Sequence, residues 1–259
     1  MASFTTFNTS QISKALVFGA GRGIGLSFVK ELLQNNPAIE IVAQYRDPHR
    51  ASELLALAKQ NSALRPVLLN PSHEEELSSF VSEFKEKGFS PSLVVSTIGF
   101  LHSDSVQPEK SSRDLSSEQL HEYFQVNSIT NMLLLKHVKG LLSRKEPSWV
   151  GVLNGRVSSI EDNVMGGWYG YRMSKASLNM GLKCFAIELK NSRFPVQVFS
   201  LHPGTVATAL SEPFRKNVKH DVFDPGVSAK RLLESMEKFS PTVERNIAHM
   251  AYDGELLTW

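Results

Sequence analysis

Tyr171 and Lys175 are the residues of this 259-residue chain whose types and spacing best suit acid–base chemistry. They stand four positions apart in YGYRMSKASLN, a stretch that predicts a helix, and therefore share one helix face. A phenol has an unperturbed pKa of about 10, so it exchanges protons at neutral pH only when a nearby cation favours the phenolate. Lys175 could supply that cation, although such a pair alone also fits a solvent-exposed helix face.

The glycine-rich segment VFGAGRGIGLSF, residues 17–28, is a second candidate for chemistry. It follows a predicted strand and opens a predicted helix, where backbone N–H groups and the helix dipole can bind a pyrophosphate. Its spacing, Gly19-x-x-x-Gly23-x-Gly25, departs from G-x-G-x-x-G because Ile24 stands in the place of the last glycine. Glycine-rich turns also end strands in proteins that bind no nucleotide, so the glycines alone are weak evidence. The prediction that a dinucleotide binds here rests on the position of the loop between a strand and a helix.

Two arginines indicate which dinucleotide is bound. Gln44 or Tyr45 fills the position where an NAD-binding fold usually has an acid for the adenosine ribose, and Arg46 follows directly. Arg22 projects from the glycine loop, and a guanidinium is suited to bidentate binding of phosphate. We predict that Arg22 and Arg46 bind the 2′-phosphate of NADP(H), with NAD(H) as the less favoured cofactor. In the alternative, both arginines are solvated and Asp47 binds the ribose.

Alternating strands and helices must position these segments. Seven short aliphatic or β-branched runs predict strands at residues 14–18, 39–43, 65–69, 92–96, 149–153, 196–200 and 247–251. Helical spacing of apolar residues recurs between them, as in the stretches from Leu26, Glu75 and Ser177. This order predicts an α/β Rossmann fold: a seven-stranded, mainly parallel, doubly wound sheet with helices on both faces and ligands at the carboxyl ends of its strands. We expect one such domain over residues 14–259, after a flexible tail at residues 1–13.

The composition argues against several other classes of protein. Hydrophobic residues make up 41% of the chain and charged residues 21%, as in a globular protein. The net charge of +2 comes with scattered basic residues, so we expect no nucleic-acid partner. The longest apolar cluster is interrupted by Lys136, short of the roughly 20 residues of a membrane helix, and the first residues fit no signal or transit peptide. We therefore expect a cytoplasmic protein.

Cysteine and histidine add two further expectations. The single cysteine, Cys184, suits a reducing compartment, and we predict that it is a buried, small hydrophobic residue inside a helix. The eight histidines show no metal-ligand spacing with cysteine or acidic residues, so we predict no metal site.

The order of the motifs resembles the short-chain dehydrogenase/reductase family from about Lys14 onward. The resemblance rests on GAGRGIG, VSTIG, FQVNSITNMLLLK, YRMSK and LHPGTVATAL, in that order. The stretch DNVMGGWYGYRMSKASLN looks like the C-factor and sniffer-like carbonyl reductase branch. The resemblance implies an NADP(H)-dependent oxidoreductase that transfers hydride between the nicotinamide and a carbonyl or alcohol substrate.

The resemblance also implies roles for individual residues. Tyr171 would be the general acid or base, and Lys175 would bind the nicotinamide ribose and lower the pKa of the tyrosine. Asn127 would bend a helix and hold a water molecule of a proton relay, although a buried or helix-capping asparagine fits its position too. The implied cofactor-binding residues are Gly19, Arg22, Gly23, Ile24, Gly25, Arg46, Asn70, Gly99, Tyr171, Lys175, Pro203, Val206 and Thr208.

The chain departs from the family's pattern around the cofactor. The usual Asn-Asn-Ala-Gly after the fourth strand is the segment 96–99, Ser-Thr-Ile-Gly, which keeps only Gly99. Asn70 replaces the usual acid near the adenine, and its amide oxygen can still accept a hydrogen bond. We expect neither change to abolish binding of the cofactor.

The serine that polarises the substrate carbonyl in the family has no clear match in this chain. Strand register puts Gly155 at its position, whereas counting back from Tyr171 gives Ser158, with Ser159 as the other candidate. The amide of Asn154 is a further possible donor. Loss of one such donor costs roughly 3 kcal/mol of barrier, so the carbonyl anchor is the open part of the predicted catalytic site.

These features leave two classes of function. The first is the carbonyl or alcohol oxidoreductase, a homodimer or homotetramer through the helices after strands four and five. The alternative is a dinucleotide-binding regulatory or signalling protein with little or no turnover, which the irregular serine region favours. We expect an apolar substrate pocket formed by residues 100–106, 160–168 and 209–222. Its predicted lining includes Phe100, Met165, Trp168, Leu210 and Phe214. Loops are predicted at residues 100–114 and 211–225, the second as a lid.

Overall fold

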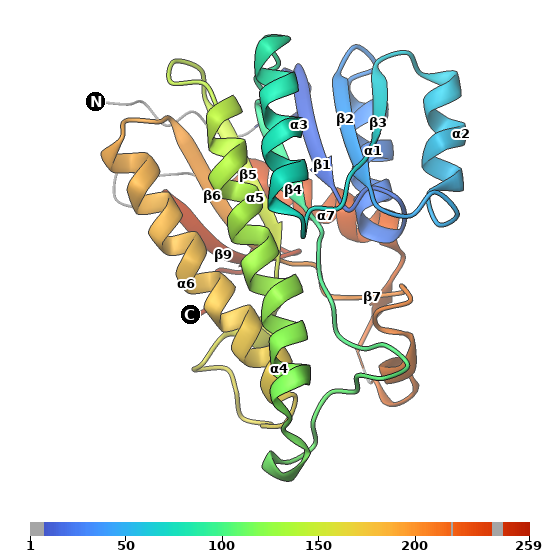
Figure 1. Cartoon of the computed structure of the whole chain (residues 1–259), viewed down its shortest axis with the longest axis vertical. Coiled ribbons are helices and arrows are strands. Elements are labelled where there is room, and N and C mark those ends of the chain that lie inside the picture. Colours follow the sequence, from blue (N-terminus) through green and yellow to red (C-terminus); the bar gives the residue numbers. More distant parts are fainter. Residues whose placement is uncertain (1–7, 219, 240–245) are drawn as a thin grey trace.

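A seven-stranded sheet lies at the centre of the computed structural model, which describes residues 8–218, 220–239 and 246–259 (Figure 1). The strand order is β3-β2-β1-β4-β5-β6-β9, and all pairings within this sheet are parallel. The strands are β1 (Lys14–Phe18), β2 (Glu40–Tyr45), β3 (Leu64–Leu68), β4 (Leu93–Ser96), β5 (Ser148–Leu153), β6 (Val196–His202) and β9 (Ile247–Ala251). Each predicted strand is present within a few residues of its expected bounds, so the predicted doubly wound α/β fold is confirmed.

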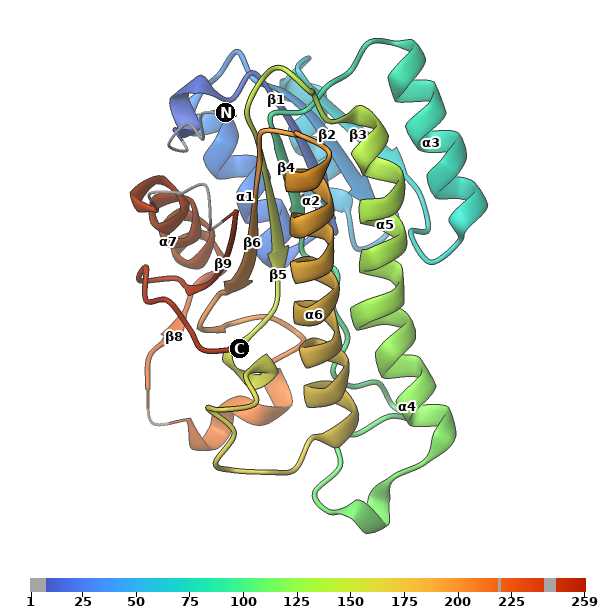
Figure 2. The ribbon, with the colours of Figure 1, turned by 90° about the vertical axis from the view of Figure 1, so that its left-hand side faces the viewer.

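Helices cover both faces of this sheet (Figure 2). They are α1 (Gly23–Asn35), α2 (Ser52–Gln60), α3 (Glu74–Glu86), α4 (Ser117–Phe124), α5 (Thr130–Val138), α6 (Tyr169–Asn191) and α7 (Pro225–Lys238). Buried residues of α1, α2 and α7 form one apolar core with the sheet, and those of α3, α5 and α6 form a second core on the other face. The helices thereby leave the carboxyl ends of the strands open to a ligand.

Strand β1 shows why the strands read as continuous apolar runs. Ala15 and Val17 pack into the core beneath α1 and α7, whereas Leu16 and Phe18 pack into the core beneath α3 and α6. Successive side chains point to opposite faces of a sheet, so a strand covered on both faces must be apolar at every position.

The two segments predicted as loops contain short ordered elements. Residues 211–225 include a 3-10 helix at Glu212–Asn217 and strand β8 (Val222–Phe223), which pairs in parallel with β7 (Thr205–Val206) in a separate small sheet. Residues 100–114 end in a 3-10 helix at Ser112–Asp114. The predicted lid is therefore a partly folded segment.

The start of the described chain is attached to the domain. Residues 1–7 of the predicted tail lie outside the described residues. From there the chain forms a 3-10 helix at Thr9–Gln11, buries Ile12 completely, and donates the Thr9 backbone N–H to Glu237 Oε1 at 2.7 Å. Within the described ranges, no helix is both long and apolar enough to cross a membrane.

The prediction that Cys184 is buried is wrong. Its side chain is exposed on α6. Met173, Met180 and Ile187 are exposed on the same helix, while Leu178 and Leu182 face the core. The outer face of α6 thus carries apolar residues and a cysteine that composition alone cannot distinguish from core residues.

Candidate active site

The predicted site residues gather at one edge of the sheet. The glycine loop follows β1, Gly99 follows β4, Asn154 follows β5 and Pro203 follows β6. The carboxyl ends of parallel strands meet at the same edge, so segments far apart in the sequence become neighbours there.

The glycine loop has a backbone that other residues could not adopt. Gly19 and Gly23 have φ angles of +76° and +56°, in the left-handed region. A Cβ atom on Gly25 would lie 2.2 Å from the carbonyl oxygen of Gly19. Gln44 fixes the loop from below, because its Oε1 accepts the Gly19 N–H at 2.8 Å and its Nε2 donates to the Leu69 carbonyl at 2.6 Å. Gln44 is thus a buried support of the loop, and of the two candidates at the ribose position Tyr45 is the one less deeply buried.

A cavity of about 850 Å³ opens beside this loop, and three arginines line it: Arg22, Arg46 and Arg50. Burial lowers the pKa of Arg22, and the neighbouring Arg50 and Arg46 lower it further. The acidic residue of this group, Asp47, accepts the backbone N–H groups of His49 and Arg50 and pairs with Arg50 Nε at 3.4 Å. Among the described residues, neither Arg22 nor Arg46 has an ion-pair partner, so the cluster can take up an anion.

The segment after β6 reaches across to the glycine loop. Thr208 Cγ2 lies 3.4 Å from the position that a Cβ atom on Gly23 would occupy. Pro203 accepts a hydrogen bond from Ser228 Oγ at 2.8 Å, and Val206 is buried in β7. The structure therefore brings Thr208 beside the predicted pyrophosphate loop.

Asn70 is engaged in a local turn. Its Oδ1 accepts the backbone N–H of Ser72 at 3.2 Å, and its Nδ2 lies 3.1 Å from His73 Nε2. The neighbouring Pro71 lines the cavity, whereas Asn70 is not among the lining residues. Contact between Asn70 and an adenine stays a prediction.

Lys175 and Asn127 meet at Gly99, and Tyr171 lies beside Lys175 on α6. All three side chains are buried, with relative exposures of 9%, 3% and 0%. Lys175 Nζ lies 6.0 Å from the centre of the Tyr171 ring and donates to the Leu153 carbonyl at 3.1 Å. A Cβ atom on Gly99 would lie 3.6 Å from Lys175 Nζ and 3.8 Å from Asn127 Oδ1. The tyrosine and lysine therefore share a buried helix face, and the exposed-face alternative is wrong.

Asn127 lies in a π-helical turn, Gln125–Ile129, between α4 and α5. Such a turn distorts a helix at a functional position. The Asn127 side chain accepts the Phe100 N–H at 2.7 Å and donates to the Phe100 carbonyl at 2.9 Å and to Ser174 Oγ at 3.0 Å. It thereby ties the segment after β4 to α6, the helix that carries Tyr171.

The protonation states of the pair follow from burial. Burial raises the pKa of Tyr171 to about 12 and lowers the pKa of Lys175 to about 8. Burial alone accounts for the raised pKa of Tyr171 in the protein without cofactor, and the lowering of this pKa by Lys175 stays a prediction. A protonated phenol is suited to act as an acid.

Aromatic side chains surround Tyr171. The rings of Tyr123 and Trp168 lie 6.2 Å and 6.0 Å from that of Tyr171, and Phe214 of the predicted lid lies 5.0 Å from Trp168. Phe100 packs against Tyr123 at 5.6 Å. Of the other predicted pocket residues, Leu210 lines the cavity, but Met165 is 87% exposed and does not line it. Met165 is placed at a solvent-exposed bend of its loop, which its apolar character did not reveal.

Glu109 supports the start of α6, a role that the sequence did not reveal. It is 1% exposed, and both carboxylate oxygens accept the Gly170 N–H, at 3.2 Å and 3.3 Å. Its backbone carbonyl accepts the Trp168 N–H at 2.6 Å. A carboxylate at a helix N-terminus is stabilised by the helix dipole, so Glu109 holds the end of the helix two residues from Tyr171.

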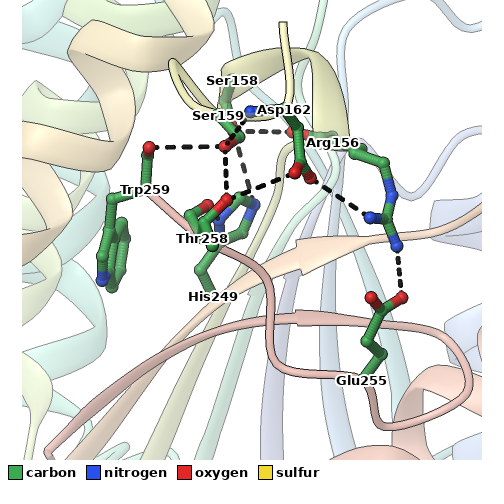
Figure 3. Close-up of polar contacts among 9 residues, drawn as sticks. Arg156, Ser158, Ser159, Asp162, His249, Glu255, Thr258 and Trp259 are labelled. Atoms are coloured by element: carbon green, nitrogen blue, oxygen red, sulfur yellow. Dashed lines mark hydrogen bonds and ion pairs between the residues drawn. The ribbon is translucent and has the colours of Figure 1, made fainter.

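The Ser158 hydroxyl is used in the support of its own loop (Figure 3). It donates to the Gly155 carbonyl at 2.6 Å and accepts a hydrogen bond from Asn179 Nδ2 at 2.8 Å. Asn154 Nδ2 is also engaged, with the Lys175 carbonyl at 3.2 Å and Asn179 Oδ1 at 2.7 Å. Neither side chain has a free donor for a substrate in this structure.

The Ser159 hydroxyl points toward the end of the chain (Figure 3). It lies 2.9 Å from Thr258 Oγ1 and 3.3 Å from the Trp259 carbonyl oxygen, and it accepts the Asp162 N–H at 3.2 Å. Arg156 bridges Asp162, at 3.2 Å, and Glu255. The loop with both candidate serines is thus fastened to the last residues of the chain.

A doubly wound parallel sheet with a glycine loop after β1 defines a class of dinucleotide-binding proteins, and the buried Tyr171 and Lys175 lie at its binding edge. The sequence pattern of the short chain dehydrogenase family matches residues 13–219. The chain belongs to this family and is an oxidoreductase of the short-chain type.

Known proteins agree with this assignment over almost the whole chain. A 1-hydroxy-2-glutathionyl-2-methyl-3-butene dehydrogenase of Rhodococcus is 27% identical over 248 residues, which cover 96% of this chain and 100% of the relative. A benzil reductase of Bacillus cereus is 25% identical over 219 residues, 80% of each chain. The NADPH-bound carbonyl reductase from chicken fatty liver has a TM-score of 0.83 at 25% identity, covering 96% of this chain and 99% of that structure.

Proposed function

We propose that the protein is an NADPH-dependent reductase of carbonyl compounds. The observation that carries the proposal is the buried pair of Tyr171 and Lys175, with Lys175 and Asn127 both at Gly99, at the same sheet edge as the glycine loop. Gly99 allows a cofactor to approach Lys175 and Asn127 closely, and the neighbouring Tyr171 is a proton donor for the substrate.

The cofactor would lie along residues that fit it. The glycine loop offers backbone N–H groups and the start of α1 to a pyrophosphate, and the crowding at Gly25 keeps the loop close to the helix. Arg22, Arg46 and Arg50 line the same cavity, which suits a 2′-phosphate, and the pairing of Asp47 with Arg50 argues against Asp47 as a ribose acid. The NADPH-bound state of the chicken carbonyl reductase adds support for the phosphorylated cofactor.

Protonation of the carbonyl oxygen is the step that the protein supplies. When bound, the reduced nicotinamide supplies the hydride for the carbonyl carbon. Tyr171 gives its proton to the carbonyl oxygen, and its pKa of about 12 keeps the phenol protonated across the physiological range. Lys175 Nζ, held by the Leu153 carbonyl, would bind the ribose hydroxyls of the cofactor.

The walls near Tyr171 favour an apolar, ring-containing substrate. Trp168, Phe100 and Phe214 pack against the cluster that contains Tyr171, and the ring of Phe214 contacts that of Trp168. Such walls bind flat apolar groups by burial of area and by ring contacts. Benzil, the substrate in the name of the Bacillus relative, is a suitable probe of this class.

The direct test is oxidation of NADPH in the presence of a panel of aldehydes, ketones and quinones that includes benzil. Wild-type protein should consume NADPH with at least one member, and Tyr171→Phe should reduce kcat by about 100- to 10,000-fold with little change in NADPH affinity. If NADPH binds but wild type and Tyr171→Phe are indistinguishable with every member, the proposed function is wrong.

A regulatory protein with little turnover is the second candidate. The observation in its favour is that the hydroxyls of Ser158 and Ser159 are engaged with the protein itself. The buried proton donor Tyr171 argues against it, since a protein that only binds the cofactor has no use for a phenol beside Lys175. The same panel separates the two functions.

We also propose a homodimer or homotetramer, with a small molecule rather than a macromolecule as substrate. Met173, Met180 and Ile187 are exposed along α6, which follows β5 as the prediction required. Light scattering after size-exclusion chromatography should give a mass of two or four chains, and Met180→Glu should shift it toward one chain. A wild-type mass of one chain would contradict this assembly.

A further inference from the structure

We propose that the side chain of His202 donates the hydrogen bond to the substrate carbonyl oxygen for which Ser158, Ser159 and Asn154 were the sequence candidates. The inference rests on the proposed function and adds a catalytic residue to it. It follows from a buried nitrogen of His202 that has no hydrogen-bond partner among the described residues.

His202 stands beside the missing serine in the sheet. It is the last residue of β6, next to β5, and the register pairs Leu153 with Leu201. The Asn154 N–H donates to the Leu201 carbonyl at 2.7 Å, so the pairing extends one residue past the end of β5. Asn154 and His202 are therefore neighbours, and Gly155 follows at the position of the serine.

The imidazole reaches the space that a side chain at Gly155 would take. A Cβ atom on Gly155 would lie 3.9 Å from His202 Nδ1 and 3.3 Å from Val157 Cγ2. Val157 in turn packs against the cluster that contains Tyr171. His202 and the cluster of the proton donor thus flank the one position in this wall that has no side chain.

His202 Nδ1 is buried and has no hydrogen-bond partner among the described residues. A buried polar atom without a partner is costly, so such atoms mark sites where a ligand completes the bonding. Asn154 Oδ1 is also unpartnered, but an amide oxygen accepts hydrogen bonds and cannot donate one to a carbonyl. Nδ1 of His202 can be the donor that this wall lacks.

The charge state of His202 suits this role. Burial lowers the pKa of His202 to about 4, with Arg156 nearby as a further cause. The imidazole is therefore neutral at physiological pH and carries one N–H group. With the proton on Nδ1 it donates to a carbonyl oxygen without competing with Tyr171 for the acid role. Such a donor acts where negative charge develops in the transition state.

Two substitutions at position 202 separate the hydrogen bond from the packing. His202→Leu keeps much of the bulk but has no donor, whereas the amide of His202→Asn can place an N–H near the position of Nδ1. We expect His202→Leu to lower kcat about 100-fold with the carbonyl compound that wild type reduces fastest, and His202→Asn to retain most of the activity. His121→Leu, at an exposed position of α4, is the matched control and should retain wild-type turnover.

A serine at position 155 provides the decisive rescue. Gly155 has φ of −173°, an extended backbone that any residue adopts, and Val157 needs to move by only a few tenths of an ångström to admit a side chain. Addition of Gly155→Ser to the His202→Leu variant should raise its turnover at least ten-fold. A residue that only supports the fold would not be replaced by a hydroxyl on the segment that follows β5. NADPH affinity, measured by fluorescence titration, should stay within about two-fold in every variant.

The outcomes distinguish this inference from the proposed function. Turnover that depends on Tyr171 and is unchanged in His202→Leu would overturn the role of His202 and leave the reductase in place. Loss of turnover in His202→Leu with no rescue by Gly155→Ser or His202→Asn would also overturn it. Absence of any Tyr171-dependent turnover in wild type would overturn both.

Discussion

Replacing Lys175 by methionine should make the protein more stable while it destroys the proposed catalytic site. The side chain is 3% exposed, and its Nζ has one hydrogen bond, to the Leu153 carbonyl. Burial lowers the pKa of Lys175 to about 8 from an ordinary value of 10.5. The folded protein therefore carries a charge at neutral pH that the surroundings disfavour, and methionine of similar length removes that charge.

The magnitude follows from the pKa. The difference between 10.5 and about 8 corresponds to about 3 kcal/mol of folding free energy at pH 7, where the lysine is charged in both states. The variant also loses the hydrogen bond to the Leu153 carbonyl, which lowers its stability by about 1 kcal/mol. We expect a net gain of about 2 kcal/mol for Lys175→Met, or an increase in Tm of about 4–8 °C for a protein of this size.

The pH dependence of stability tests the predicted stabilisation by Lys175→Met a second time. Between pH 8 and 10.5 the unfolded chain binds more protons at Lys175 than the folded protein does, so the stability of wild type rises with pH in this window. Methionine has no such rise, so the advantage of the variant should shrink from pH 7 to pH 10.

Urea denaturation of both proteins without cofactor, at pH 7 and at pH 10, measures this difference. Lys190→Met, at the exposed end of the same helix, is the control and should change stability by less than about 0.5 kcal/mol. A Lys175→Met variant that is no more stable than wild type at pH 7, or whose advantage grows with pH, would refute the account of the buried charge.

Three further predictions concern the cofactor and α6. Wild type should bind NADPH at least ten-fold more tightly than NADH, and Arg46→Asp should reduce this difference in affinity. Both affinities are measured by fluorescence titration. Equal affinities in wild type would contradict the role of the arginine cluster. Gly25→Ala should weaken NADPH binding more than ten-fold because its Cβ atom would lie 2.2 Å from the Gly19 carbonyl oxygen. Gly21→Ala, whose nearest contacts are 3.4 Å, should fold and bind NADPH far more tightly than Gly25→Ala. Equal NADPH affinity of the two variants would count against the loop geometry. Glu109→Gln should lower the free energy of unfolding by about 1 kcal/mol and lower kcat, because the helix that carries Tyr171 loses a carboxylate at its N-terminus. Unchanged stability in thermal denaturation would show that Glu109 does not support the helix.

Local patterns were enough to predict the framework of the site. Residues 15–18 and 93–95 are apolar at every position because both faces of the sheet are covered, and that burial pattern is visible in the sequence. Tyr171 and Lys175 are four residues apart on one helix, so their common face follows from helical geometry.

Contacts between distant segments account for what could not be predicted. The Ser159 hydroxyl is fixed by Thr258, 99 positions away, and Glu109 reaches Gly170 across 61 positions. No local pattern encodes these pairings. The same holds for His202, whose side chain lies beside Gly155 only because β5 and β6 are neighbours in the sheet. Cys184 shows the limit of composition, because an apolar residue type does not say which face of its helix meets the core.

The most direct test of the central claim is the fate of the hydride. NADPH deuterated at the transferable position of its nicotinamide ring should be incubated with the carbonyl compound that wild type reduces fastest, and the alcohol examined by mass spectrometry. The account predicts one deuterium on the carbinol carbon with wild type, and a rate of formation at least about 100-fold lower with Tyr171→Phe. Formation of no deuterated alcohol by wild type, or its formation at equal rates by both proteins, would contradict the account.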